Sequence, residues 1–237
     1  MSVDEAELIV FLLDGSGSMK SENTPDGKQK IEHLNLIVKS VLQRLQNSSK
    51  VNSFKIALVY FSTNVTVESN GGRDYFSVSE ALGFYKNPLD VVGGEKTAIA
   101  DALKETSNLL DKFNEDEGIP SIKHATVLLF TDGNEVIKTS NDVINEAQNL
   151  ISHIISPSIA TISFGSDADE HLLESIATQP NERQIQHLRN ANVYHHLKNR
   201  QKLFLVGHES GKISEEKVIA IRNFIETLSK TASAKKG

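Results

Sequence analysis

The chain contains 237 residues, of which 38% are hydrophobic and 24% are charged, and only five are prolines. This composition predicts a sizeable buried core and excludes disorder over most of the length. The formal net charge of −6 disfavours a nucleic-acid partner, because the chain has no basic field to attract phosphates. The absence of cysteine excludes disulfides and thiolate metal sites.

The first seven residues are acidic and lack the basic start of a secretory signal. The apolar run that follows, residues 8–13, is too short to cross a bilayer, and no other run approaches the roughly twenty residues required. We therefore expect a cytoplasmic protein without a membrane partner. Because no low-complexity linker interrupts the chain, we also expect a single domain over residues 1–231, followed by a flexible tail at 232–237.

The N-terminal part of the chain alternates between strand and helix patterns. The unbroken apolar run at 8–13 predicts a strand that is buried on both faces. A polar loop at 20–28 precedes residues 31–47, where apolar side chains recur at helical spacing. A second buried strand is expected at 54–61, and the alternating residues 63–68 favour a short antiparallel partner for it.

The alternation continues after a long irregular stretch at 71–88, which we interpret as a surface excursion. Helical spacing predicts helices at 99–113 and 143–154. Buried strands are expected at 125–130 and 159–164. Each of these strands follows a helix, as in a parallel sheet built from right-handed crossovers.

The C-terminal part is less regular. A short helix is expected at 170–177 and a closing helix at 218–228. The last strand can lie at 192–195 or at 203–206, and the pattern does not choose between them. The whole order predicts an α/β fold: a doubly wound, mostly parallel six-stranded sheet with one short antiparallel edge strand and helices on both faces.

Oxygen-bearing side chains follow two of the predicted strands and precede one helix. Asp14, Ser16 and Ser18 come directly after the first strand, Asp132 follows the strand at 125–130, and Thr97 opens the helix at 99–113. Open α/β sheets bind ligands at the carboxyl ends of their strands, where the strand order reverses. If these loops meet there, carboxylates and hydroxyls surround one point, a ligand set that suits a hard cation such as Mg²⁺.

Each residue also has a purely local interpretation. The first motif can be an ordinary polar turn, Thr97 a helix N-cap, and Asp132 part of an Asx turn. The presence of all three segments in one chain favours the metal site. The glycines beside these residues, Gly15, Gly17 and Gly133, are expected to let the backbone turn sharply.

Three motifs together resemble the von Willebrand factor A domain over about residues 6–230. They are Asp14-x-Ser16-x-Ser18, Gly93-Gly94-x-x-Thr97-Ala98-Ile99-x-x-Ala102-Leu103, and Thr131-Asp132-Gly133. That family's metal-ion-dependent adhesion site uses the same three loops. Ser18-Met19 followed by Ile31-Glu32-His33-Leu34-Asn35 also resembles the bacterial TerY-like branch, which is associated with tellurite resistance.

The resemblance implies that Ser16, Ser18 and Thr97 bind Mg²⁺ directly or through water, with Mn²⁺ or Ca²⁺ as substitutes, while Asp14 and Asp132 support the ion. One coordination position would accept an Asp or Glu of a partner protein. The TerY-like branch implies an adaptor in stress response or phosphosignalling, with a kinase, a phosphatase or an AAA+ ATPase as partner. The inserted Glu95-Lys96 pair and Ala100, where a small glycine is common, depart from the family pattern and put the placement of Thr97 in question.

Two other hypotheses compete with a protein-binding module. One is a Mg²⁺-dependent phosphohydrolase or nucleotide-binding enzyme, but the chain has no Gly-x-x-x-x-Gly-Lys-Ser/Thr loop. Asp14-Gly15-Ser16 also lacks the second aspartate of haloacid-dehalogenase-like phosphatases. Because the three loops contain no His or Cys that could act as base or nucleophile, we expect no enzymatic activity. The other hypothesis is that the ion only stabilises the loops.

Other polar clusters favour structural roles. His195 and His196 are interpreted as adjacent residues of a strand, which would point to opposite faces and could not share an ion. Glu115-Asp116-Glu117 is expected to be a solvated helix end. Asp167-x-Asp169-Glu170 is interpreted as the cap and first turn of the helix that follows.

Overall fold

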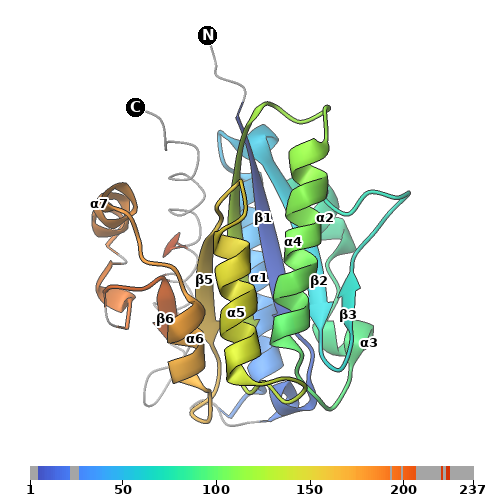
Figure 1. Cartoon of the computed structure of the whole chain (residues 1–237), viewed down its shortest axis with the longest axis vertical. Helices are drawn as coiled ribbons and strands as arrows, with labels where there is room; N and C mark the ends of the chain where they lie inside the picture. Colours follow the sequence, from blue (N-terminus) through green and yellow to red (C-terminus); the bar gives the residue numbers. More distant parts are fainter. Residues whose placement is uncertain are drawn as a thin grey trace.

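The computed structural model describes residues 5–21, 27–192, 194–198, 200–206, 220 and 223–224. A six-stranded sheet forms its centre, in the order β3-β2-β1-β4-β5-β6 (Figure 1). The strands are Glu5–Asp14 (β1), Phe54–Phe61 (β2), Val65–Val67 (β3), Ile122–Thr131 (β4), Ser158–Ser163 (β5) and Phe204–Val206 (β6). Only β3, at one edge, is antiparallel to its neighbour. The predicted fold class is confirmed.

The helices surround this sheet. They are Lys30–Gln46 (α1), Val78–Phe84 (α2), Pro88–Val92 (α3), Ile99–Glu115 (α4), Ser140–Ile151 (α5), Glu170–Ile176 (α6) and Glu182–Asn190 (α7), with 3₁₀ turns at Gly17–Lys20 (η1), Val51–Ser53 (η2) and Tyr194–His196 (η3). Among the described residues, none of the helices combines the length and apolar character that crossing a bilayer requires.

The structure resolves one alternative left open by the sequence, corrects one prediction and adds one helix that was not predicted. The last strand is β6, the second of the two alternatives, since Tyr194–His196 forms η3. The stretch at 71–88 is not irregular: it contains α2, whose capping box pairs Ser77 with Glu80, and the start of α3. Helix α7 was also missed, although Asn181 and Gln184 form the same kind of box. Most of the closing helix at 218–228 lies outside the described residues.

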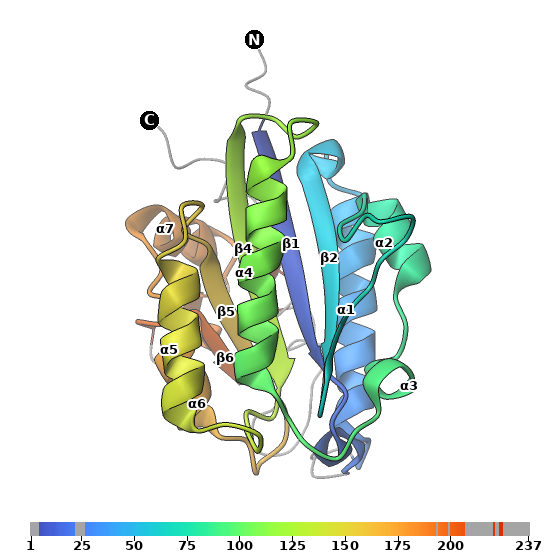
Figure 2. The same ribbon diagram turned by 45° about the vertical axis from the view of Figure 1, so that its right-hand side comes forward.

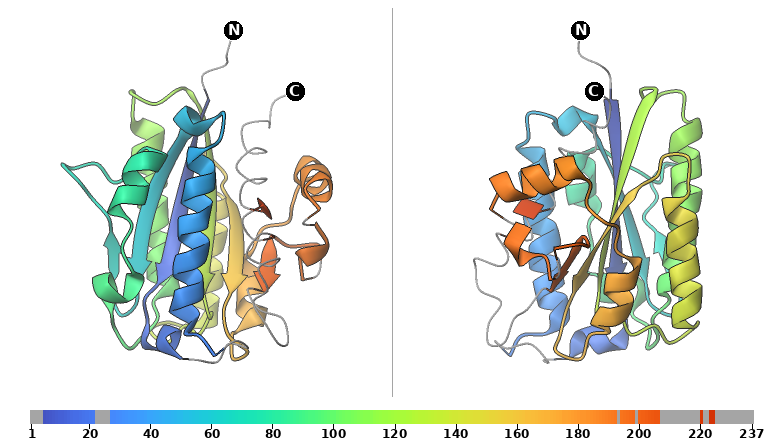
Figure 3. Two further views of the ribbon diagram at one scale, coloured as in Figure 1. Left: turned by 180° about the vertical axis from the view of Figure 1, so that it is seen from behind. Right: turned by 60° about the vertical axis from the view of Figure 1, so that its left-hand side comes forward.

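Each face of the sheet buries its own layer of side chains. On one face, Ile9, Phe11 and Leu13 pack with α1 and α2 (Figure 3). On the other face, Leu8, Val10 and Leu12 pack with α4, α5 and α6 (Figure 2). All six side chains are fully buried. Burial on both faces explains why β1 is an unbroken apolar run rather than an alternating one.

The strand order reverses between β1 and β4. From β1 the chain crosses to β2 through α1, whereas α4 on the opposite face leads to β4 on the other side of β1. Because β1 and β4 are parallel neighbours, their carboxyl ends lie side by side. Asp14 ends β1, and Asp132 immediately follows β4. The fold therefore brings these two carboxylates to the edge at which open α/β sheets bind ligands.

Candidate metal centre

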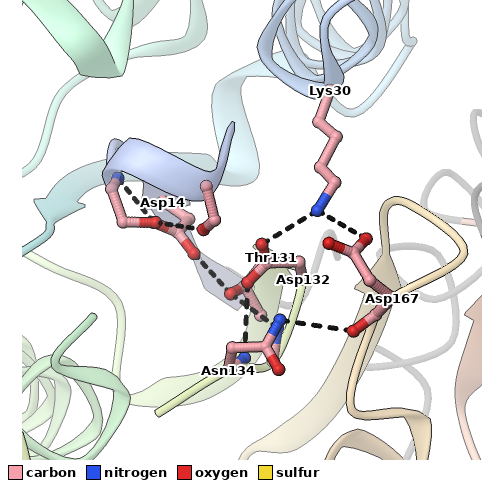
Figure 4. A network of polar contacts seen from close by, with 9 residues as sticks. Asp14, Lys30, Thr131, Asp132, Asn134 and Asp167 are labelled. Atoms are coloured by element: carbon pink, nitrogen blue, oxygen red, sulfur yellow. Dashed lines mark hydrogen bonds and ion pairs between the residues drawn. The ribbon is translucent and has the colours of Figure 1, made fainter. Parts of the chain in front are cut away.

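The first loop holds Asp14 and two serines in a compact hydrogen-bonded arrangement. Asp14 is fully buried, and its Oδ1 accepts a hydrogen bond from the Ser16 backbone N–H at 2.8 Å. Its Oδ2 accepts a hydrogen bond from the Thr131 hydroxyl at 2.5 Å, which joins the ends of β1 and β4 (Figure 4). The Ser16 and Ser18 hydroxyl oxygens lie 3.0 Å apart. The predicted polar turn is present, and it orients the carboxylate toward β4.

Glycine is required at Gly15 by close packing rather than by backbone angle. A Cβ atom at this position would lie 2.6 Å from the carbonyl oxygen of Pro88 in α3. The expectation of a sharp turn is met instead at Gly133, whose φ of +77° lies in the left-handed region. The first loop is therefore pressed against α3, which the sequence pattern did not indicate.

The second loop, residues 93–97, is anchored to the end of β2. The Gly94 N–H donates to the Ser62 hydroxyl oxygen at 3.2 Å, and that hydroxyl donates to the Val92 carbonyl at 2.6 Å. A Cβ atom on Gly17 would lie 3.6 Å from the Cα of Glu95, so this loop also packs against the first. The inserted Glu95-Lys96 pair is therefore accommodated beside the first loop.

Thr97 itself is buried, with 2% of its surface exposed, and precedes Ala98, the N-cap of α4. The interpretation of Thr97 as the N-cap is wrong. Ala98 has no side-chain oxygen to accept hydrogen bonds from the first turn of α4. Another residue performs that role.

Glu135 caps α4 from the third loop and joins it to the second. One carboxylate oxygen of Glu135, Oε2, accepts hydrogen bonds from the backbone N–H groups of Ile99 at 2.6 Å and Ala100 at 3.2 Å. The other, Oε1, accepts hydrogen bonds from the N–H groups of Ile137 and Lys138 at 2.8 and 3.1 Å. A carboxylate is favoured at a helix N-terminus. Glu135 was not among the predicted site residues. The alanine at the N-cap of α4 was the available signal, because it cannot cap the helix and a side chain from elsewhere must do so.

The third loop contains Asp132, which is fully buried. Its Oδ1 accepts a hydrogen bond from the Asn134 N–H at 3.3 Å, the expected Asx turn. The Val136 N–H donates to the Thr97 carbonyl at 3.2 Å, so this loop contacts the second. The five predicted residues thus lie on three adjoining loops; all but Ser18, which is half-buried, are buried.

Lys30, the first residue of α1, also reaches this site. Its side chain is fully buried, and its Nζ lies 3.1 Å from Asp132 Oδ2 and 2.7 Å from Asp167 Oδ1 (Figure 4). Lys30 was not among the predicted site residues. The available signal was a lysine in the first turn of a helix, where its positive charge is unfavourable. The segment Asp167-x-Asp169-Glu170 forms the predicted cap and first turn of α6, since Asp169 accepts a hydrogen bond from the Leu172 N–H at 3.0 Å and Glu170 lies in the first turn. The pairing of Asp167 with Lys30 was not predicted.

Asp14 and Asp132 place two buried carboxylates at the meeting point of these loops. Burial, and then the negative charge of nearby Asp132, raise the pKa of Asp14 to about 7, against the opposing effect of hydrogen bonds from Thr131 and Ser16. A divalent cation would remove this conflict between two buried carboxylates. The described residues contain no cluster of three or more His, Asp or Glu that could hold a metal. A cation at this edge would therefore rely on hydroxyls as well as carboxylates, which fits Mg²⁺.

The other polar clusters lie away from these loops. His195 and His196 belong to η3 rather than to a strand, so the argument from opposite strand faces was wrong. Their ring centroids lie 3.9 Å apart. Glu115 ends α4 and Asp116 is its C-cap, as expected of a helix end.

Comparison with known families matches residues 9–200 to the von Willebrand factor type A domain. The chain belongs to this family. Von Willebrand factor A domains typically mediate protein interactions, often with a bound metal ion, rather than catalysis. Inter-alpha-trypsin inhibitor heavy chain H4 of Homo sapiens is 28% identical to this chain over 173 residues, which cover 71% of this chain and 17% of that protein. The chain thus spans about a sixth of the length of the curated relatives it matches.

Solved structures share the fold. BatB from Bacteroides thetaiotaomicron has a TM-score of 0.61 at 14% identity, over 95% of this chain and 99% of BatB. The manganese-loaded TRAP protein from Plasmodium vivax has a TM-score of 0.55 at 17% identity, over 94% of this chain and 74% of TRAP. At these identities the likeness shows the von Willebrand factor A fold alone.

Proposed function

We propose that this von Willebrand factor A domain is a metal-dependent protein-binding module. The observation that carries the proposal is the pair of buried carboxylates, Asp14 and Asp132, next to the paired hydroxyls of Ser16 and Ser18. These groups lie where the strand order reverses between β1 and β4. Hydroxyl-rich sites leave a divalent ion short of negative charge, and such an ion favours an additional anionic ligand.

Each side chain has a distinct part in this proposal. Ser16, Ser18 and Thr97 hold Mg²⁺ through their hydroxyls or through water, and Mn²⁺ or Ca²⁺ can replace it. Asp14 and Asp132 balance its charge and orient the hydroxyls and waters. When bound, the ion supplies an electrophilic position for an Asp or Glu carboxylate of the partner protein.

The arrangement of Asp14 supports binding over catalysis. A phosphohydrolase of this type would use an aspartate as a nucleophile with a free oxygen. Asp14 is buried, and both of its oxygens accept hydrogen bonds, from Ser16 and from Thr131. A Mg²⁺-dependent phosphatase assay tests this point: turnover that is lost in Asp14→Asn would replace our proposal with the enzyme.

We further propose a protein partner, and no nucleic acid or membrane. The TerY-like resemblance supports a cytoplasmic adaptor in stress response or phosphosignalling, bound to a kinase, a phosphatase or an AAA+ ATPase. A pull-down in Mg²⁺ buffer, in EDTA, and in EDTA followed by excess Mg²⁺ tests the metal dependence of capture. Capture that is unaffected by EDTA would contradict the proposal.

Ser16→Ala tests the ion site directly. Removal of one hydroxyl ligand is expected to weaken Mg²⁺ binding by about tenfold, or about 1.4 kcal/mol, measured by isothermal titration calorimetry. The circular dichroism spectrum should not change, because Ser16 lies in a loop. Ser69→Ala, which alters an exposed serine beyond β3, is the matched control and should bind like the wild type. Equal Mg²⁺ affinity in Ser16→Ala and Ser69→Ala would refute the assignment.

A further inference from the structure

Lys30 places a buried positive charge beside the candidate metal centre. Its ammonium lies 3.1 Å from Asp132 Oδ2 and 2.7 Å from Asp167 Oδ1, with none of the side chain exposed. Burial of a charge is costly even when the charge is paired, and a lysine in the first turn of α1 also opposes the helix dipole. Stability alone therefore gives little reason for a lysine here.

The backbone around Lys30 is shaped to admit its side chain. Gly165, in the loop between β5 and α6, has a φ of +88°, and a Cβ atom there would lie 2.2 Å from the Lys30 Cε and 2.8 Å from its Nζ. Any larger residue at 165 would displace the ammonium. The Asn134 side chain also donates to the Asp167 backbone carbonyl at 3.4 Å. The loops after β4 and β5 thus define the position of the lysine.

The pairing is selective between the two buried carboxylates. Lys30 contacts Asp132, whereas the oxygens of Asp14 accept from Ser16 and Thr131. The ammonium thus offsets one of the two negative charges that would balance a divalent ion. The ion, Asp14, Asp132 and Lys30 together carry a net charge of +1, and without Lys30 these groups would be neutral; Asp167, which is more exposed and also pairs with the ammonium, reduces this difference.

We propose that Lys30 is an internal counter-ion that weakens metal binding and strengthens the capture of an external carboxylate. This inference rests on the proposed function, since it concerns the same site. Lys30 acts through Asp132 and is a positioning residue, not a ligand. Asp167, whose side chain is 43% exposed, moderates the effect because it shares the ammonium with Asp132.

Two substitutions test the counter-ion with opposite expected signs. Lys30→Gln keeps a hydrogen-bond donor but removes the charge, so Mg²⁺ affinity measured by calorimetry should rise by about tenfold. Asp167→Asn removes the second carboxylate that pairs with Lys30 in the described part of the chain, so more of the lysine charge acts on Asp132 and Mg²⁺ affinity should fall by about threefold or more. Lys20→Gln is the matched control: it removes an exposed lysine at the end of η1, and solvent should limit its effect to less than about twofold.

The second readout is carboxylate capture, with acetate as the probe. Acetate that binds Mn²⁺ displaces metal-bound water, which lowers the water-proton relaxation rate of the Mn²⁺-loaded protein. Acetate affinity should fall by about tenfold in Lys30→Gln and rise in Asp167→Asn, opposite in each case to the change in metal affinity. A lysine that only supported the fold would lower both affinities when replaced.

The outcomes separate this inference from the proposed function. Lower Mg²⁺ affinity in Lys30→Gln, or changes of the same sign in both readouts, would overturn the counter-ion while the binding module stands. If Lys30→Gln does not fold, the Asp167→Asn variant provides the test by itself. The Asp167 side chain is half-exposed, so its replacement leaves no cavity. Unchanged Mg²⁺ and acetate affinities in Asp167→Asn would also overturn the inference. A wild-type protein that binds neither Mg²⁺ nor Mn²⁺ would instead remove the proposed function.

Discussion

Glu7 shows what incomplete pairing does to a buried carboxylate. Glu7 lies in β1 with 1% of its surface exposed, and its Oε1 accepts a hydrogen bond from the Thr126 hydroxyl at 2.8 Å. Its Oε2 has no hydrogen-bond partner within the described part of the chain. Burial raises the pKa of Glu7 well above its usual value, although the Thr126 hydrogen bond and the charge of Lys50 act in the opposite direction.

Glu7→Gln is expected to stabilise the protein at neutral pH. The folded state keeps the Glu7 proton at pH values where the unfolded chain has lost it, so the free energy of unfolding falls as the pH rises above about 4.5. The free energy of unfolding stops falling only at pH values above the raised pKa of Glu7. A glutamine has no charge to bury, so urea unfolding should show a gain of about 1–3 kcal/mol at pH 8 and a smaller gain at pH 5.

Glu117→Gln is the matched control for that substitution, because Glu117 is exposed. It should leave the free energy of unfolding within about 0.5 kcal/mol of the wild type at both pH values. A Glu7→Gln variant that follows Glu117→Gln, with no gain at pH 8, would show that the Glu7 carboxylate is tolerated in its charged form.

At the scale of elements, the site depends on how the ends of helices and strands are joined. Thr97 precedes α4, whereas Asp132 follows β4, and no rule of local structure holds them together. Glu135 connects the loop that contains Thr97 to the loop that contains Asp132. One of its carboxylate oxygens accepts hydrogen bonds from the start of α4, and the other accepts them from residues 137 and 138. The N-terminus of α4 is therefore capped by a side chain from another loop, and the second loop is positioned by the third.

Glu135→Gln should weaken both stability and metal binding. Gln has one acceptor oxygen in place of two and no charge to favour the helix N-terminus. We expect a loss of about 1–2 kcal/mol in the free energy of unfolding and a fall of about threefold or more in Mg²⁺ affinity. Urea unfolding and calorimetry measure the two effects.

The control is Glu80→Gln, which alters the capping box of α2. It is expected to lower stability while it leaves Mg²⁺ affinity unchanged, because α2 packs against α1 rather than against the three loops. If Glu135→Gln, like the control, lowered stability without changing Mg²⁺ affinity, the result would contradict the inference that Glu135 positions Thr97.

At the scale of the whole molecule, the site forms only when the sheet is assembled. Its residues come from the ends of β1 and β4 and from the start of α4. The hydrogen bond between Thr131 and Asp14 alone joins positions 117 residues apart in the sequence. An unfolded chain cannot gather these oxygens, so an ion that binds here binds the folded state and stabilises it.

Thermal unfolding should therefore depend on Mg²⁺. At a free concentration one hundred times Kd, binding adds about 2.7 kcal/mol to the free energy of unfolding. For a chain of this length, Tm should rise by roughly 5–10 °C, and EDTA should reverse the rise. The same Mg²⁺ concentration should raise Tm less in Ser16→Ala. A Tm that is identical with Mg²⁺ and with EDTA would contradict specific binding to the folded state.

The sequence predicted most of the sheet because burial on both faces leaves unbroken apolar runs. Residues 8–13, 54–61, 125–130 and 159–164 all lie in or overlap β1, β2, β4 and β5. The prediction was wrong at 71–88, although the Ser77–Glu80 capping signal was present and Val78, Ala81, Leu82 and Tyr85 recur at helical spacing; the pattern covers only two turns between glycine- and proline-containing segments. The positions of Asp14, Ser16, Ser18, Thr97 and Asp132 on three adjoining loops were predictable too, whereas metal binding by these residues stays a prediction.

By itself, then, the sequence determined the order of β1 to β5 and of α1, α4, α5 and α6, with the polar residues at their ends, since these follow from local patterns of apolar and polar side chains. Only the tertiary structure decided the roles of Lys30, Glu135 and Gly15. Each depends on a contact with a distant segment: Lys30 with Asp132, 102 residues away, Glu135 with the start of α4, and Gly15 with α3. Local patterns contain no information on such contacts, because packing of the whole sheet and its helices brings these segments together.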